Sequence, residues 1–165
     1  MGVQISLPEV VVEELRKRAA RAGISLEEYL IDIATRDLDP NSAAEKYLMG
    51  AKQLLQDAKQ ELEKGDLRQA SEKIWGACAL AIKAHALAKR GTRLESHRDL
   101  WVYKNEVAKE LGDLVRTAFL KADSMHRNFY EGLATREDVE DSLKDVENLV
   151  ERIAESIKSD STSSR

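Results

Sequence analysis

The chain has 165 residues, of which 42% are hydrophobic and 34% are charged. This length fits one domain, or one domain with a small appendage, and excludes two domains of full size. The single cysteine, Cys78, excludes a disulfide within the chain, and the few glycines and prolines favour helices over a β-sandwich. We expect a cytoplasmic protein without membrane contact, because no apolar run approaches the roughly 20 residues that cross a bilayer.

The formal net charge of −4 is unevenly distributed along the chain. Residues 41–91 carry nine Lys and Arg against six Asp and Glu, whereas residues 1–40 carry five against eight. Residues 135–165 are acidic as well, with five against nine. A protein with this overall charge does not bind every polyanion, but its basic middle segment is compatible with a local groove for nucleic acid.

The first forty residues predict a strand followed by two helices. Residues 3–7 alternate apolar and polar side chains, which is typical of a half-buried strand. Pro8 suits the first position of a helix, and Gly23 suits the left-handed cap that would end it. Ser25 and Glu28 then form a capping box, which places the start of a second helix at Ser25.

The rest of the chain predicts an antiparallel helical bundle over residues 41–158. We expect its five helices to occupy about 42–64, 67–90, 96–111, 113–130 and 135–158. The second of these is apolar nearly all round from Ile74 to Ala88, so we expect it to be central. The last one repeats apolar residues in the alternation of a helix seam, and residues 159–165 form a polar tail that we expect to be disordered. The predicted fold class is therefore all-α, with a strand-helix-helix arm at residues 1–40.

The arm resembles a ribbon-helix-helix module, a unit found in many small repressors and antitoxins. The resemblance rests on Ser6-Leu7-Pro8, Leu15, Ala19, Gly23-Ile24-Ser25 and Glu28-Tyr29-Leu30. It implies a homodimer, because a lone strand cannot pair with itself and two copies would form an antiparallel ribbon. It also implies that Gln4 and Ser6 face the major groove of DNA. The acidic balance of the arm favours the other interpretation, a dimerisation arm that does not bind DNA.

The sequence from residue 44 onward is similar to the archaeal PaREP family, whose members belong to the HEPN-like helical bundles. The motifs that carry this resemblance are Gly65-Asp66, Gln69-Ala70-Ser71-Glu72-Lys73, Trp75-Gly76, Ala81-Ile82-Lys83-Ala84, Ser96-His97 and the run from His126 to Gly132. The resemblance implies an antiparallel HEPN-like bundle over most of residues 42–158. It implies no particular activity.

A nuclease motif common among HEPN proteins is incomplete in this sequence. Many of those proteins are metal-independent ribonucleases with an Arg, often followed by a polar residue, and a His a few residues further on. Arg127-Asn128 begins this motif, but Gly132, Leu133 and Ala134 stand where the His should follow. An imidazole is needed there to move the proton of the 2′-hydroxyl, so we expect no catalytic residue.

Several side chains in the bundle are candidates for binding a ligand or nucleic acid. They are Lys83, His97, Arg98, His126, Arg127, Asn128 and Tyr130. Lys83 interrupts an apolar helix, where a lysine must pair, reach the surface or face a polar cavity. His97 and Arg98 open a helix, and helix N-termini favour anions. Tyr130 is available for stacking on a base.

Two of these candidates have structural alternatives. His126 borders an apolar stripe and suits a partly buried structural histidine. Arg127 follows Asp123 by one helical turn, so an ion pair along the helix is an alternative to a phosphate contact.

These features together predict a non-catalytic protein that binds RNA or another nucleic acid, or a nucleotide, and acts as a homodimer. We expect no cofactor and no metal, since the sequence has no glycine-rich phosphate loop and its three histidines are scattered. One alternative is a protein-interaction or structural component of a toxin-antitoxin-like system. Another is a DNA-binding repressor that uses Gln4 and Ser6. A tetratricopeptide scaffold is disfavoured, because no repeat of about 34 residues recurs.

Overall fold

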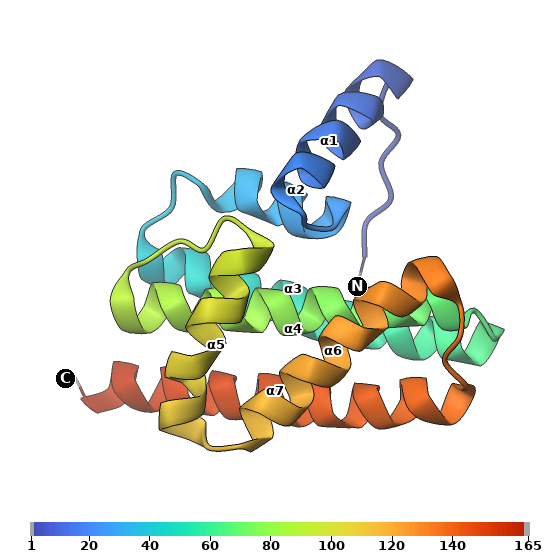
Figure 1. The fold of residues 1–165 in the computed structure, drawn as a ribbon. Helices are drawn as coiled ribbons and strands as arrows, with labels where there is room; N and C mark the ends of the chain where they lie inside the picture. The colour runs from blue at the N-terminus through green and yellow to red at the C-terminus, as the bar shows by residue number, and fades with distance from the viewer. Residues whose placement is uncertain (1, 164–165) are drawn as a thin grey trace.

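The computed structural model describes residues 2–163, and within that range the protein is all-α (Figure 1). Its helices are α1 (Glu9–Ala22), α2 (Leu26–Thr35), α3 (Pro40–Lys64), α4 (Leu67–Arg90), α5 (His97–Leu111), α6 (Leu114–Glu131) and α7 (Arg136–Ser163). The long helices α3, α4 and α7 pack against one another, and α5 and α6 cross them (Figure 1). The predicted all-α class is confirmed.

Helix α4 is the centre of the bundle, as its apolar sequence predicts. Every residue from Ile74 to Leu87 is buried. Helices α3, α5, α6 and α7 all pack on it. A helix that is apolar nearly all round must be covered on all sides, so the composition of α4 determines how the other helices are arranged.

Capping residues set the turns between helices. Gly65 adopts a left-handed conformation with φ of 81°, and the Asp66 side chain accepts a hydrogen bond from the Gln69 N–H at 3.0 Å. Ser96 and Asp99 form a reciprocal capping box at the start of α5. These caps satisfy backbone N–H groups that have no partner inside a helix, and they fix where α4 and α5 begin.

Two predicted boundaries are corrected. Helix α3 begins at Pro40 instead of Ser42, because the Asp39 side chain accepts from the Ser42 N–H and Pro40 lacks only an N–H that would be unpaired there. At the other end α7 runs to Ser163, so residues 159–163, predicted to be a disordered tail, are helical. Residues 164 and 165 lie outside the described range. No helix within that range is long and apolar enough to cross a membrane.

The predicted N-terminal strand is absent. Residues 2–8 have no regular secondary structure and are exposed, with Val3 at 89% and Ile5 at 73%. A strand needs backbone hydrogen bonds from a neighbouring strand, and residues 2–163 contain no strand that could supply them. Gln4 and Ser6 are exposed in the same segment.

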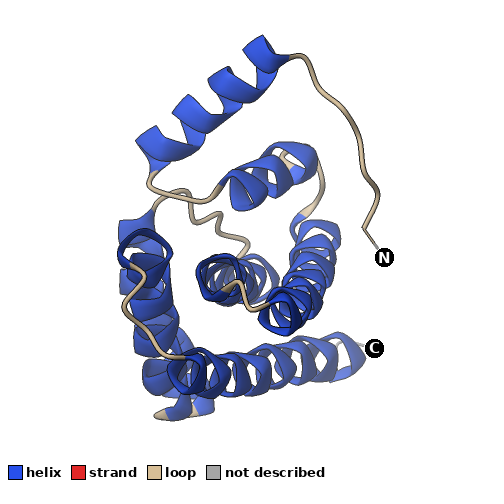
Figure 2. Cartoon of the chain, turned by 90° about the vertical axis from the view of Figure 1, so that its right-hand side faces the viewer, coloured by secondary structure: helices blue, strands red, loops and turns tan. Residues whose placement is uncertain are grey.

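The two helices of the arm differ in how they are attached. Helix α1 packs chiefly on α2 and projects from the bundle (Figures 1 and 2), whereas α2 packs on α3 and α4. Apolar side chains remain exposed on both helices, among them Val10 and Val11 on α1 and Leu30 and Ile33 on α2. The arm therefore combines one helix that belongs to the bundle surface with one that is mostly free of it.

Candidate functional site

Lys83 is paired inside the protein. Its Nζ lies 2.7 Å from Glu28 Oε2 and 2.8 Å from Asp32 Oδ2, both on α2. The side chain of Lys83 is 1% exposed and that of Glu28 is fully buried. Tyr47 on α3 donates its hydroxyl to Asp32. These contacts make Lys83 the internal counter-ion of two acids and take it out of the predicted ligand-binding groove.

The pKa directions in this cluster follow from burial and charge. Burial alone would lower the pKa of Lys83, but Glu28 and Asp32 together outweigh it and raise that pKa. Burial raises the pKa of Glu28 against the attraction of Lys83. Neither oxygen of Glu28 accepts a well-aligned hydrogen bond among the described residues, so the carboxylate is held by the lysine charge.

His97 on α5 and His126 on α6 meet beside Trp75 of α4. The two imidazole centroids are 6.1 Å apart, and they lie 5.2 and 5.4 Å from the indole of Trp75. Trp75 is fully buried, while the histidine side chains are 34% and 22% exposed. Two candidate residues that are distant in the sequence thus share one surface, with a buried indole as their support.

The hydrogen bonds of His97 define its protonation state. The indole N–H of Trp101 donates to His97 Nε2 at 2.8 Å, and an indole can only donate, so Nε2 is the acceptor and Nδ1 carries the proton. Asp123 Oδ1 lies 3.3 Å from the same Nε2, and this contact is therefore not a hydrogen bond of the neutral ring. Burial lowers the pKa of His97, although Asp123 opposes the effect.

The pKa of His126 is shifted in the opposite direction from that of His97. Its Nδ1 lies 3.1 Å from Glu72 Oε2 of α4, and this hydrogen bond raises the pKa of His126 above its ordinary value despite burial. Asp123 raises it further. The surface therefore pairs a neutral imidazole with one that holds a proton more readily.

The outermost groups at this surface are a cation and an aromatic ring. The Arg127 side chain is 67% exposed, with its Nη2 3.9 Å from Asp123 Oδ2, and Tyr130 is 68% exposed with its ring 5.7 Å from that of His126. Asp123 and Glu72 are recessed, with side chains 15% and 12% exposed. We call His97, His126, Arg127 and Tyr130 the histidine surface.

Arg98 extends the exposed positive charge of the same helix end. It follows His97 on the first turn of α5, is exposed, and makes no ion pair with any described residue. Lys73 differs from Arg98, because its Nζ lies 2.7 Å from Glu27 Oε1 of α2.

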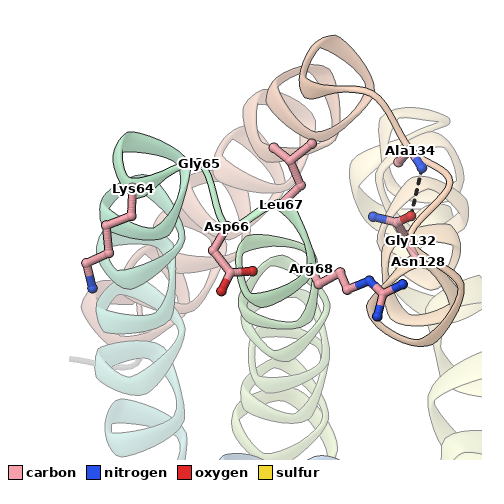
Figure 3. Close-up of a pocket in the computed structure, with 8 residues that line it drawn as sticks. All are labelled: Lys64, Gly65, Asp66, Leu67, Arg68, Asn128, Gly132 and Ala134. Atoms are coloured by element: carbon pink, nitrogen blue, oxygen red, sulfur yellow. Dashed lines mark hydrogen bonds between the residues drawn. The ribbon is translucent and has the colours of Figure 1, made fainter.

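Asn128 has a structural role. It donates to Ser71 Oγ at 2.9 Å and accepts from the Ala134 N–H at 2.8 Å, which ties the α6–α7 turn to α4 (Figure 3). It lines an open pocket of about 460 Å³ in which the Arg68 guanidinium lies over Gly132. Asn128 is 5% exposed and both ends of its amide are engaged. The structure thus separates it from the histidine surface, although it is adjacent to Arg127 in the sequence.

Gln4 and Ser6, the two candidates for DNA contacts, do not belong to the histidine surface. Gln4 and Ser6 lie in the exposed segment 2–8, and neither forms a hydrogen bond within the described chain.

A second histidine cluster escaped the sequence analysis. His85 Nδ1 lies 2.9 Å from the Tyr103 hydroxyl and its Nε2 lies 2.8 Å from Glu110 Oε2. Burial lowers the pKa of His85 and raises that of Tyr103 to about 12. Burial would raise the pKa of Glu110, but bonds from Ser156, His85 and Lys89 lower it to about 2. His85 lies within an apolar run and its partners lie on α5, so no spacing in the sequence indicates the cluster.

Cys78 is fully buried in α4, and burial raises the pKa of its thiol. Among residues 2–163 no three His, Cys, Asp or Glu side chains are arranged to hold a metal ion.

Comparisons with known proteins place the bundle within a family. Residues 39–150 match the sequence model of the Archaeal PaREP1/PaREP8 family. A Sulfolobus solfataricus protein of known crystal structure is similar in fold, with a TM-score of 0.59 and 24% sequence identity. That similarity covers 66% of this chain and 96% of the other. No match was found among curated proteins.

Proposed function

The chain belongs to the archaeal PaREP1/PaREP8 family, and we propose that this member binds single-stranded RNA or a nucleotide at the histidine surface without cleaving it. The observation that carries this proposal is the order of exposure: Arg127 and Tyr130 lie outermost and the carboxylates of Glu72 and Asp123 are recessed. A ligand that approaches this surface meets a guanidinium and an aromatic ring first.

Each group of the histidine surface has a defined role in the proposal. Arg127 binds a phosphate through its planar guanidinium, which matches two phosphate oxygens. Protonated His126 adds a second charge, since Glu72 raises its pKa. Tyr130 provides a face on which a base stacks. Arg98 supplies phosphate attraction at the start of α5.

The geometry supports binding over cleavage. A general base needs a free lone pair, and the Nε2 lone pair of His97 accepts the indole N–H of Trp101. The Nδ1 of His126 donates to Glu72, which raises the pKa of His126 and favours the protonated ring, a form that has no lone pair for general-base catalysis. The HEPN-like character of the bundle forms part of this proposal, with a nuclease motif that Gly132 and its neighbours leave incomplete.

Substitution of Arg127 tests this function directly. We expect Arg127→Gln to weaken binding of a fluorescent single-stranded RNA oligonucleotide about tenfold, because a charge-assisted contact is lost. The slope of log affinity against log salt should also fall by about one. Arg116→Gln is the matched control, because Arg116 is exposed on the same helix but pairs with Asp113 at the opposite end. Fluorescence anisotropy across a salt series measures both quantities.

The other outcomes of that assay discriminate between functions. Equal weakening by both substitutions would contradict a localised site. Binding of duplex DNA alone would favour a repressor acting through residues 2–8, and no binding of either nucleic acid would favour a protein-interaction component of a toxin-antitoxin-like system. Shortened RNA after incubation would contradict a non-catalytic protein.

We further propose that the protein is a homodimer joined through the arm. The ribbon-helix-helix resemblance of residues 1–40 supports this proposal, as does the exposure of apolar residues on α1 and α2. Val10 is 71% exposed, and such side chains are usually covered in an obligate interface. A second copy would cover them in a symmetric contact.

A charge introduced into this apolar face tests the dimer. We expect the wild-type protein to sediment at twice the chain mass and the Val10→Glu, Ile33→Glu variant to sediment as a monomer, because a carboxylate is costly to bury in an apolar interface. Met49→Glu is the control, since Met49 is exposed on α3 of the bundle. Sedimentation velocity measures the mass, and a wild-type monomer would contradict the proposal.

A further inference from the structure

A cavity separate from the histidine surface lies where the arm meets the bundle. It has a volume of about 320 Å³ and is bounded by α2, α3 and the segment between α4 and α5. Tyr29 and Asp32 of α2 and Arg36, which caps the end of α2, line it together with Tyr47 of α3 and Arg93 of the connecting segment. The volume is at the lower end of the range for small-molecule sites, which often form where two parts of a fold meet.

The two arginines of this cavity, Arg36 and Arg93, form no ion pair with the described residues. Arg36 is exposed and forms no ion pair with any described residue. Arg93 uses its Nη2 to donate to the carbonyls of Thr35 and Leu38, at 2.7 and 3.2 Å, and neutral carbonyls leave its charge in place. Glu95 on the rim carries one opposing charge.

The Asp32 carboxylate, which also lines the cavity, already accepts hydrogen bonds from other residues, so it does not pair with Arg36 or Arg93. Asp32 receives hydrogen bonds from Lys83 Nζ, at 3.0 and 2.8 Å, and from the Tyr47 hydroxyl. Lys83 is shared with Glu28, so the charge of Asp32 is only partly offset, but its oxygens are engaged by Lys83 and Tyr47 and it pairs with neither arginine. The guanidinium groups of Arg36 and Arg93 therefore have no carboxylate partner among the described residues and are available to bind an anion.

The remaining walls are apolar or aromatic. Ile24 and Leu94 are buried apolar residues that line the cavity, and the rings of Tyr29 and Tyr47 bound it. Such a lining favours a ligand whose body is apolar or aromatic.

We propose that this cavity binds a small organic anion, a carboxylate or a phosphate monoester with a compact apolar body. The guanidinium groups of Arg36 and Arg93 hold the anionic group, and the body lies against the tyrosine rings. Because the lining comes from both α2 and the bundle, the bound anion fixes the arm in place. This proposal is independent of RNA binding at the histidine surface.

Two anionic probes and one neutral probe, all with the same phenyl body, test the proposal. We expect benzoate or phenyl phosphate to bind at least about tenfold more tightly than neutral benzamide, because charge-assisted hydrogen bonds to guanidinium are lost in the amide. Comparison of benzoate with phenyl phosphate shows whether the preferred group is a carboxylate or a phosphate. Titration followed by the amide NMR signals of residues 22–36 and 91–96 measures each affinity on the full-length protein.

Two variants locate the site. Arg36→Gln should weaken binding of the preferred anion about tenfold and leave benzamide unchanged. Since Arg36 makes no ion pair with the residues that the structure describes, this variant should fold even if Arg93→Gln does not. Arg127→Gln is the control that should retain anion binding. Equal affinities for benzoate, phenyl phosphate and benzamide, absence of saturable shifts with both anions, or an Arg36→Gln protein that binds as wild type would each overturn the proposal.

Discussion

Lys83→Met should lower the free energy of unfolding by about 3–5 kcal/mol, because it leaves Glu28 and Asp32 near the core without a counter-ion. Methionine has a similar length and helix propensity, so the loss reports the charge. Urea denaturation at neutral pH measures the effect. Lys46→Met is the control, since Lys46 is exposed on α3 and should change stability by less than about 0.5 kcal/mol.

The same variant has a pH signature with a definite sign. Without Lys83, the buried carboxylate of Glu28 favours its protonated form in the folded state, so its pKa lies higher when folded than when unfolded. The folded variant then binds more protons, and its stability should rise as the pH falls from 7 towards 5. Addition of Glu28→Gln and Asp32→Asn should recover most of the loss at pH 7. A loss of stability that neither acid nor these two substitutions reduce would contradict an electrostatic role for Lys83.

Trp75→Ala should also cost about 3–5 kcal/mol of unfolding free energy, because it opens a cavity in the centre of α4. The indole packs edge-on against Phe119 with centroids 5.7 Å apart, and it contacts both surface imidazoles. The cavity would therefore lie directly beneath His97 and His126. Urea denaturation measures the loss of stability.

The conservative change at this position is the matched control. Trp75 Nε1 is buried without a hydrogen-bond partner in the described chain, so Trp75→Phe removes no hydrogen bond. We expect this variant to lose less than about 1.5 kcal/mol. Equal losses from alanine and phenylalanine would show that ring packing at this position does not support the fold.

The sequence predicts the helices well because their signals are local. Capping side chains at Asp66 and Ser96 satisfy N–H groups three residues away, and the glycine at position 65 takes a left-handed conformation. The central place of α4 follows from its composition alone. The prediction of a strand at residues 3–7 is wrong for the described chain, because no other strand within it could pair with this segment.

The site is less predictable because its contacts join distant residues. Lys83 is conspicuous in an apolar helix, yet nothing in the sequence indicates that Glu28 and Asp32 are its partners. The pairing of His97 with His126 depends on the packing of α5 and α6 around Trp75. Asn128 is adjacent to Arg127 in the sequence, but successive helix residues face different directions, so adjacency does not place both at one surface.

The ion pairs of Lys83 make the stability of the bundle depend on the arm. Deletion of residues 1–40 would remove Glu28 and Asp32 and leave Lys83 buried without a partner. A loss of binding after such a deletion would then reflect unfolding. Point substitutions on the exposed faces of α1 and α2 separate the role of the arm from the stability of the bundle.

Binding at the histidine surface is tested most directly by the imidazole NMR signals of the protein during titration with a single-stranded RNA oligonucleotide. The chain has three histidines, and His85 is a buried internal control at 2% exposure. We expect the signals of His97 and His126 to shift in proportion to bound RNA while that of His85 stays in place. RNA that binds by anisotropy but leaves the signals of His97 and His126 unmoved would contradict the proposed site.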